Sequence, residues 1–213
     1  YRIILGCNND ARRADGGGRA SYGNHLNISC HAQTYEHLNA VAEKVAPFLA
    51  TAMTTWDGTL RVWVDDNCKL CVGVSQRMHK MKHLTGSNTM DDRGIVDLRD
   101  EPHTSDNRFR RLHIIGPDKH RSEFVVWLRA GMTALVIEMA EDRSYRMPVT
   151  MTEASFEQGK DVANRDFSGL AKVWRVGRTK RSSIEIQKLY LDAARDYFHG
   201  DDDAAEIIEE MDR

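Results

Sequence analysis

The segment from Ser122 to Glu141 is the feature that most limits how this chain can fold. Its apolar residues recur at helical spacing and spread over most of the circumference of the expected helix. They are Phe124, Val125, Leu128, Met132, Leu135, Val136 and Met139. Such a stretch predicts a core helix, packed among other elements rather than lying on the surface.

Several short segments have the alternating or apolar character of strands. They are residues 3–5, 21–30, 60–63, 70–74, 94–98 and 111–115. A second helix is predicted from an N-cap at Thr34 to about Thr55, kinked or interrupted at Pro47. A third begins at a capping box, Ser182 to Glu185, and reaches His199. Residues 143–181 are weakly patterned, and residues 201–213 predict a short acidic helix or a frayed tail.

Composition excludes several classes of protein. The chain has 213 residues and a formal charge of −2, so it lacks the polybasic surface typical of nucleic-acid or membrane-surface binding. No apolar run approaches the roughly 18–20 residues that span a bilayer, and the first residues do not resemble a signal peptide. We therefore expect no nucleic-acid partner, no membrane and a cytoplasmic location.

The cysteines do not form the dense pattern of a disulfide scaffold. The chain has four Cys, and Cys68 and Cys71 form a C-x-x-C pair within a strand-like segment. A zinc or redox site is one interpretation of this pair. Small apolar residues on a strand are the simpler interpretation, because no second C-x-x-C pair follows.

One face of the strand predicted at residues 21–30 is small and polar. Alternation puts His25 and Asn27 near the middle of that face, while Leu26 and Ile28 point the other way. A face of this kind is typical of a cavity wall, although a solvent-facing edge would show a similar pattern.

The stretch from Arg99 to His113 has the densest set of chemically active side chains. Pro102 favours an extended backbone at Glu101, so that Glu101 and His103 point to the same side. Arginines suited to paired phosphate contacts lie within or beside it, at Arg93, Arg99, Arg108, Arg110 and Arg111. A solvated loop and a site for an anionic ligand are both compatible with this pattern.

Five segments, in this order, resemble motifs of the Pup ligase and Pup deamidase (depupylase) family, which belongs to the glutamine-synthetase-like carboxylate–amine ligases. They are NND at 8–10, SYGNHLN at 21–27, VSQR at 74–77, RGIVDLRDEPHTSDNRFRRLHII at 93–115 and AGMTALVIEM at 130–139. The late helix SSIEIQKLYLDAARDYF at 182–198 also resembles a helix of that family. The likeness extends from Ile3 to about Phe198.

The resemblance implies an α+β fold in which a curved, mostly antiparallel sheet forms a cradle packed by helices. It implies ATP and Mg as cofactors, and a Pup-like protein tag and tagged proteins as partners. In such enzymes ATP converts a carboxylate to an acyl phosphate and an amine displaces the phosphate, while the deamidase branch hydrolyses the corresponding amide or isopeptide. The direction of the reaction stays open.

The resemblance also implies roles for individual residues. His103, Arg111 and Glu101 would be catalytic, and His25 and His103 would lie near the metal. Phosphate and nucleotide would be held or oriented by Arg77, Arg99, Arg110, Asn27 and Gln76. These roles follow from the family motifs and not from spacing alone.

The chain also departs from the family motifs. Leu26 stands where the family has a glutamate, and His120 stands in place of an asparagine in a turn after the last expected strand. The family's metal-binding carboxylate segments have no counterpart here. We therefore expect residues 1–199 to be the central part of a longer catalytic domain, with 200–213 as its acidic helix or tail and the rest of the enzyme as a partner.

Two other functions remain open. The chain could belong to a relative that acts on a small molecule or another peptide, a reading that the changes at Leu26 and His120 favour. It could also be a non-catalytic binding or regulatory subunit that keeps the cradle without the metal carboxylates.

Overall fold

The structure is a computed structural model, and it describes residues 10–12, 19–21, 23–64, 67–87, 92–98, 109–120 and 122–213. In chain order the elements are β1 (Asp10–Arg12), β2 (Arg19–Ser21), β3 (Leu26–Cys30), α1 (Tyr35–Ala52), β4 (Arg61–Val64), β5 (Leu70–Gly73), the 3₁₀ helix η1 (Met78–Lys80), β6 (His83–Gly86), β7 (Gly94–Asp97), β8 (Arg110–Ile114), α2 (Glu123–Glu141), α3 (Glu153–Arg165), β9 (Trp174–Val176), β10 (Thr179–Arg181), α4 (Ser183–Tyr197) and α5 (Asp202–Asp212).

The centre of the fold is a four-stranded sheet with strand order β3-β8-β7-β6. The pairs β3–β8 and β7–β8 are antiparallel, and β6–β7 is parallel. Three two-stranded hairpins, β1–β2, β4–β5 and β9–β10, complete the described strands. The predicted α+β class with a mostly antiparallel, open sheet is therefore confirmed.

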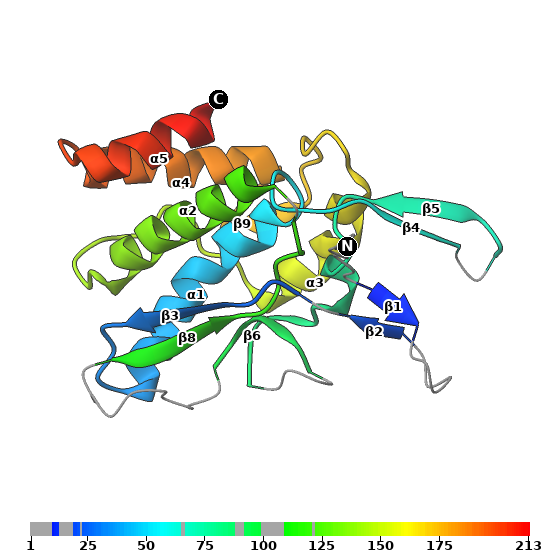
Figure 1. Cartoon of the computed structure of the whole chain (residues 1–213), viewed down its shortest axis with the longest axis horizontal. Helices are drawn as coiled ribbons and strands as arrows, with labels where there is room; N and C mark the ends of the chain where they lie inside the picture. The colour runs from blue at the N-terminus through cyan, green and yellow to red at the C-terminus, as the bar shows by residue number, and fades with distance from the viewer. Residues whose placement is uncertain are drawn as a thin grey trace, which may run out of the picture.

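The helices form layers on one side of this sheet. Helix α1 packs against β6, β7 and β8, while α2 packs against α1 and β3. Helix α1 crosses behind β3 and β8, and α4 and α5 pack on α2 (Figure 1). The face of the sheet opposite the one that α1 and α2 cover is called the open face.

Helix α2 is the predicted core helix. The larger apolar residues from Leu128 to Met139 are buried, and Ser122 caps the first turn by accepting a hydrogen bond from the backbone of Val125. Gly131 allows α5 to approach closely, because a Cβ at this position would lie 2.8 Å from Ile207. The first turn leaves the core: Phe124, which the pattern assigned to the buried stripe, is 50% exposed.

Helix α1 begins at its predicted cap, Thr34, but it runs through Pro47 as one helix and is not interrupted there. A proline inside a helix removes a backbone donor and leaves earlier carbonyls without their usual partner. Helix α4 contacts the turn before this proline, since the hydroxyl of Tyr190 donates to the carbonyl of Lys44 at 3.0 Å. The side chain of Gln187 donates to the carbonyl of Phe48 at 2.8 Å, which fixes α4 against this turn.

The weakly patterned region 143–181 folds as α3 followed by the β9–β10 hairpin. Its anchor is Trp174, which is fully buried and stacks on Phe156 with ring centroids 6.3 Å apart. At the start of α3 the carboxylate of Glu153 accepts hydrogen bonds from the backbone of Leu84 on β6, at 3.0 and 3.1 Å. This contact occupies part of the outer edge of the central sheet, an edge that would otherwise present unpaired donors.

The C-terminal elements follow the prediction. The capping box at Ser182 and Glu185 starts α4, and the acidic segment after residue 200 forms α5. Helix α5 buries Ile208 and contacts α2 and α4. None of the described helices combines the length and the apolar character needed to cross a membrane.

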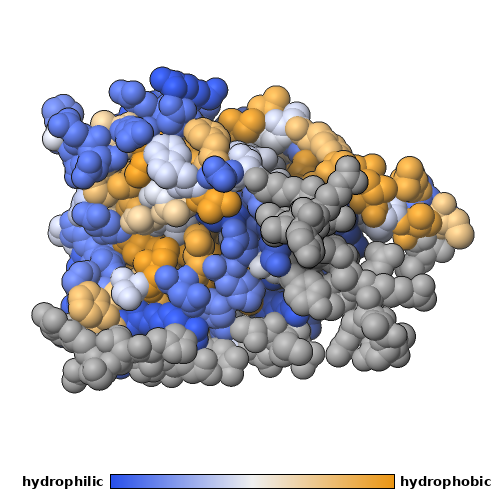
Figure 2. Space-filling view, viewed as in Figure 1, coloured by the Kyte–Doolittle hydropathy of each residue, from blue (hydrophilic) through white to orange (hydrophobic). Residues whose placement is uncertain are grey.

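The β4–β5 hairpin extends from the body and presents apolar side chains to solvent, where Figure 2 shows orange surface. Leu60, Val62, Val64 and Leu70 are each more than half exposed. Cys68 lies in the turn of this hairpin with a φ of +60°, and Cys71 lies on β5. Both are free thiols, and within the described parts of the chain no cluster of His, Cys, Asp or Glu is arranged to hold a metal ion.

Candidate functional site

The open face gathers polar side chains from three strands. The register pairs Asn27 with His113 and Ser29 with Arg111, while His113 is also opposite Asp97. Paired residues in a sheet share a face, and alternate residues along a strand face opposite sides. The intervening residues Leu112 and Ile114 are buried in the helix-covered core, so the polar residues lie together on the other face.

Three side chains form a row across this face. The Nδ1 atom of His113 lies 3.3 Å from Oδ2 of Asp97, and its Nε2 atom lies 3.1 Å from Nδ1 of His25. The two imidazole rings meet edge to face with centroids 5.0 Å apart. Asp97 is fully buried, whereas His25 is exposed. The row therefore runs from the interior of the sheet to solvent.

The surroundings of His25 favour its neutral form. Its pKa is lowered to about 4, first by loss of hydration and then by the neighbouring His113, Arg77 and Arg93, against which Asp97 acts weakly. The guanidinium groups of Arg77 and Arg93 would attract an anionic ligand to this face. At neutral pH the site thus combines an uncharged imidazole with a positive field.

Arg111 and Asn27 stand next to this row. The Nη1 atom of Arg111 donates to Oδ1 of Asn27 at 3.3 Å, which joins β8 to β3 through side chains. Arg110 is opposite Cys30, a fully buried residue, and so belongs to the helix-covered face. The two adjacent arginines thus face opposite sides of the sheet, and Arg111 is the one on the open face.

Arg77 and Gln76 hold loops in place. Arg77 is 2% exposed and donates to the carbonyls of Ile115 and Gly116 at 2.7 and 3.2 Å. Burial is the main reason why its pKa falls to about 10. It lies directly under Gly23, where a Cβ would come within 2.7 Å of its guanidinium carbon. Gln76 donates from its side chain to the carbonyl of Leu60 at 2.9 Å.

Of the predicted site residues, the structure brings His25, Asn27 and Arg111 together, with Arg77 close beneath them. Gln76 and Arg110 lie elsewhere. Glu101, His103 and Arg99 lie outside the described residues, and their roles stay predictions.

Asp97 was not among the predicted residues, although its register with His113 makes it the innermost group of the row. The signal in the sequence was a carboxylate at the end of a wholly apolar strand, Gly94 to Asp97, where all four residues are buried. Buried carboxylates are rare unless they have a partner, so such a position indicates a specific role.

A second charged group was also missed. It consists of Asp57, Asp118, His120 and Arg129, which we call the buried ion cluster. The guanidinium of Arg129 donates from Nε to Asp57 at 2.7 Å and from Nη2 to the carbonyl of Asp118 at 2.8 Å. His120 lies 3.2 Å from the same Asp57 carboxylate. Asp118 accepts from the backbone of Thr59 and Gln76 at 2.8 and 3.1 Å.

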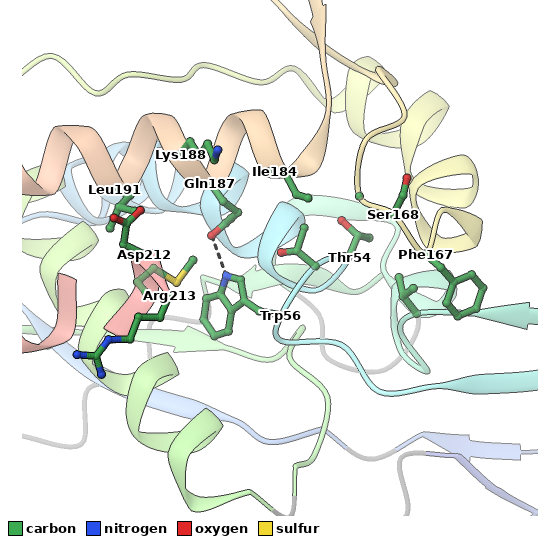
Figure 3. A pocket seen from close by; sticks show the side chains of 14 residues that line it. Thr54, Trp56, Phe167, Ser168, Ile184, Gln187, Lys188, Leu191, Asp212 and Arg213 are labelled. Carbon is green, nitrogen blue, oxygen red and sulfur yellow. Dashed lines mark hydrogen bonds between the residues drawn. The ribbon is translucent and has the colours of Figure 1, made fainter. Parts of the chain in front are cut away.

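A pocket of about 490 Å³ lies apart from the open face, between the end of α1, the loop after α3, and helices α4 and α5 (Figure 3). Trp56 and Gln187 meet in it through a hydrogen bond of 3.0 Å. None of the predicted site residues that the structure describes lines this pocket. Its lining includes the apolar side chains of Phe167, Ile184 and Leu191.

Comparison with known proteins identifies the family to which the chain belongs. The sequence pattern described as "Pup-ligase protein" matches residues 8–213, which include all three residues of the row on the open face. The chain belongs to the Pup-ligase family. Its fold agrees with this assignment, since the solved Pup ligase PafA in complex with ADP matches with a TM-score of 0.74 at 24% identity, over 96% of this chain and 45% of that one.

Curated members of the Pup-ligase family carry two different activities in their names. A Pup–protein ligase of Corynebacterium efficiens is 31% identical over 180 residues, which is 82% of this chain and 36% of the relative. A Pup deamidase/depupylase of Mycobacterium tuberculosis is 31% identical over 202 residues, which is 92% of this chain and 39% of the relative. The chain thus spans well under half the length of these relatives.

Both departures from the Pup-ligase family motifs lie off the open face. Leu26 is opposite Ile114 and packs against the hydrophobic core. His120 belongs to the buried ion cluster. Neither change removes a side chain from the row formed by His25, His113 and Asp97.

Proposed function

We propose that this chain forms the nucleotide-binding part of an ATP-dependent enzyme that acts on a Pup-like protein tag. Two motif segments of the family, at 21–27 and 93–115, meet on the open face, and the contact between His25 and His113 is the observation that carries the proposal. A solved relative binds ADP, and a second solved PafA structure is a complex with Pup, with a TM-score of 0.71 at 23% identity over 95% of this chain.

The chemistry on this face suits phosphate. Phosphoryl transfer depends chiefly on positioning and on stabilising negative charge. Arg111 provides a guanidinium on the open face, and the charge of the buried Arg77 acts on the neighbouring His25. In the proposed reaction, ATP phosphorylates a carboxylate and an amine displaces the phosphate from the acyl phosphate. A second reaction, in which water cleaves an amide or isopeptide and the amine leaves, is proposed equally, because relatives with both activities are 31% identical to this chain.

Magnesium remains a prediction of the family resemblance. Mg²⁺ prefers oxygen ligands, and carboxylates usually supply them. In the described part of the open face Asp97 is the carboxylate at hand, and no group of three or more potential ligands is arranged to hold a metal. The described residues do not make a magnesium site by themselves, so we derive no step through this ion.

The partners of the proposed enzyme are the tag, the tagged proteins, and the parts of the family's catalytic domain that this chain does not match. A cytoplasmic location stays a prediction. The positions of Leu26 and His120 off the open face favour an active enzyme over a non-catalytic subunit, since neither substitution touches the row of the site.

Nucleotide binding by Arg111→Ala tests the proposal. A hydrogen bond to a charged phosphate contributes about 1.5–3 kcal/mol, so the variant is expected to bind ADP about 10- to 100-fold more weakly. Titration calorimetry of this chain gives the dissociation constant. Arg178→Ala is the matched control, because Arg178 is exposed in the turn between β9 and β10 and should leave binding unchanged. Equal affinity of the Arg111 variant and the wild type would overturn the proposal.

A further inference from the structure

Two buried side chains join separate loops in a reciprocal way. Arg77 donates from its guanidinium to the backbone carbonyls of Ile115 and Gly116, at 2.7 and 3.2 Å. In return, the carboxylate of Asp118 accepts from the backbone N–H of Gln76 at 3.1 Å. Arg77 and Asp118 are 2% and 0% exposed. We call this arrangement the clasp, and because each loop holds the backbone of the other, it forms a firm support.

The segment that leads into β3 rests on the clasp at two points. The backbone N–H of Asn24 donates to the carbonyl of Pro117 at 3.1 Å. Gly23 lies on the guanidinium of Arg77, where a Cβ would come within 2.7 Å of Cζ and 2.8 Å of Nε. The next residue is His25, whose ring takes part in the row on the open face. The clasp thus supports the backbone directly before a side chain of the candidate site.

This close approach requires glycine at position 23. A guanidinium is the end of a long side chain and commonly swings away from an added methyl group. Here Arg77 is buried and engaged with two carbonyls, so a swing would leave both carbonyls without this donor. A methyl group at Gly23 must therefore displace the backbone that carries His25.

We propose that Arg77 is a positioning residue, which fixes the place of His25 on the open face by supporting Gly23 and Asn24, rather than a direct ligand of phosphate. Its Nε and Nη2 atoms already donate to carbonyls, and the side chain is almost wholly withdrawn from solvent. Its charge reaches the open face through space. The inference rests on the proposed function for the nature of the bound anion, whereas the support of His25 does not depend on it.

Gly23→Ala tests this support without changing any charge. Long-range ¹H–¹⁵N correlation spectra of the ¹⁵N-labelled chain report the imidazole signals, and His25→Gln assigns those of His25. We expect the His25 signals to shift in Gly23→Ala before any ligand is added. Calorimetry should show ADP binding about 10-fold more weakly, the effect of losing one hydrogen bond to a charged group. Wild-type positions of the His25 signals, or wild-type affinity for ADP, would overturn the proposal.

Gly131→Ala is the matched control. A Cβ at Gly131 would come within 2.8 Å of Ile207, where α2 meets α5, so the variant adds the same methyl group in a comparably close contact. We expect lower stability with unchanged His25 signals and unchanged ADP affinity. Equal shifts of the His25 signals in both variants would indicate a general loosening of the fold and would overturn the specific role of Arg77.

Arg77→Lys distinguishes support from direct contact with phosphate. Lysine keeps the positive charge but lacks the planar fork that meets two carbonyls. We expect this variant to shift the His25 signals and to weaken ADP binding. Adding Gly23→Ala should then cost no further affinity, because the methyl group has room once the guanidinium is gone. Losses that multiply in the double variant, or wild-type binding by Arg77→Lys, would overturn the proposal.

The signals of the ligand-free chain keep the two proposals separable. If the wild type binds no ADP, the proposed function fails, and the His25 signals of Gly23→Ala and Arg77→Lys still decide whether Arg77 supports His25. Urea denaturation shows which variants are folded. If Gly23→Ala is not folded, the His25 signals of Arg77→Lys decide: a shift supports the proposal, and wild-type positions overturn it.

Discussion

The open face and the buried ion cluster contain the same kinds of side chain but use them differently. In the buried ion cluster, Asp57 is held by Arg129 and His120, and Asp118 accepts two backbone donors. On the open face, Asp97 accepts no regular hydrogen bond from described residues and has one imidazole 3.3 Å away. The first arrangement ties loops together, whereas the second leads from a buried charge to an exposed ring.

The number of partners around a buried charge distinguishes a structural role from a functional one. A buried charge with several partners stabilises the parts that supply them, here the loop after α1 and helix α2. A buried charge with a single imidazole partner adds little to stability, so its presence points to a function. The same substitution in both places should therefore have different consequences.

Asp57→Asn should produce the largest effect on stability. Removing one partner of a buried ion pair leaves the other uncompensated, and we expect a loss of about 3–5 kcal/mol in the free energy of unfolding. Urea denaturation followed by circular dichroism measures it. Asp97→Asn is the contrasting variant and should change this free energy by less than about 1 kcal/mol, because no described donor stabilises that carboxylate strongly. Equal losses of unfolding free energy in the two variants would contradict the structural role assigned to the buried ion cluster.

The pH dependence of stability should show a smaller effect from His120. Burial is the largest influence on this ring and lowers its pKa, but the hydrogen bonds to the side chain and backbone of Asp57 together raise the pKa above 6.5, against a lowering by Arg129. A pKa raised by folding gives a contribution that is complete below pH 6.5 and is lost as the pH rises through the folded value. We expect wild-type stability to decline over this range.

His120→Asn supplies the reference for that measurement. Its free energy of unfolding should lack the decline, so the difference between wild type and variant should shrink as the pH rises above 6.5. A difference that stays constant or grows with pH would contradict the assignment of a raised pKa to His120.

The sequence predicted the fold where periodicity was strong. Helix α2 and the capped starts of α1 and α4 appear as expected, because their patterns reflect burial and local hydrogen bonds. Helix α3 was missed, since its buried face is formed by small and polar residues such as Ser155, Gly159 and Lys160. Of the two effects expected at Pro47, an interruption does not occur, and the contact from Tyr190 beside this turn comes from 146 residues away.

The site was predicted in part for a similar reason. Alternation alone placed His25 and Asn27 on one polar face, and the family motifs added Arg111. The pairing of β7 with β8, which brings Asp97 beside His113, depends on strand register and has no local signal. The motif predicts Arg77 as a phosphate ligand, and its contacts with the carbonyls of Ile115 and Gly116 depend on tertiary packing that has no local signal.

The most direct test of the central claim is a nucleotide titration observed at the histidine rings of both regions. With ATP and Mg²⁺ added to the labelled chain, the account expects the signals of His25 and His113 to shift in a saturable manner, while the signal of His120 stays in place. Shifts at His120 with none at His25 and His113 would contradict the assignment of the open face as the nucleotide site.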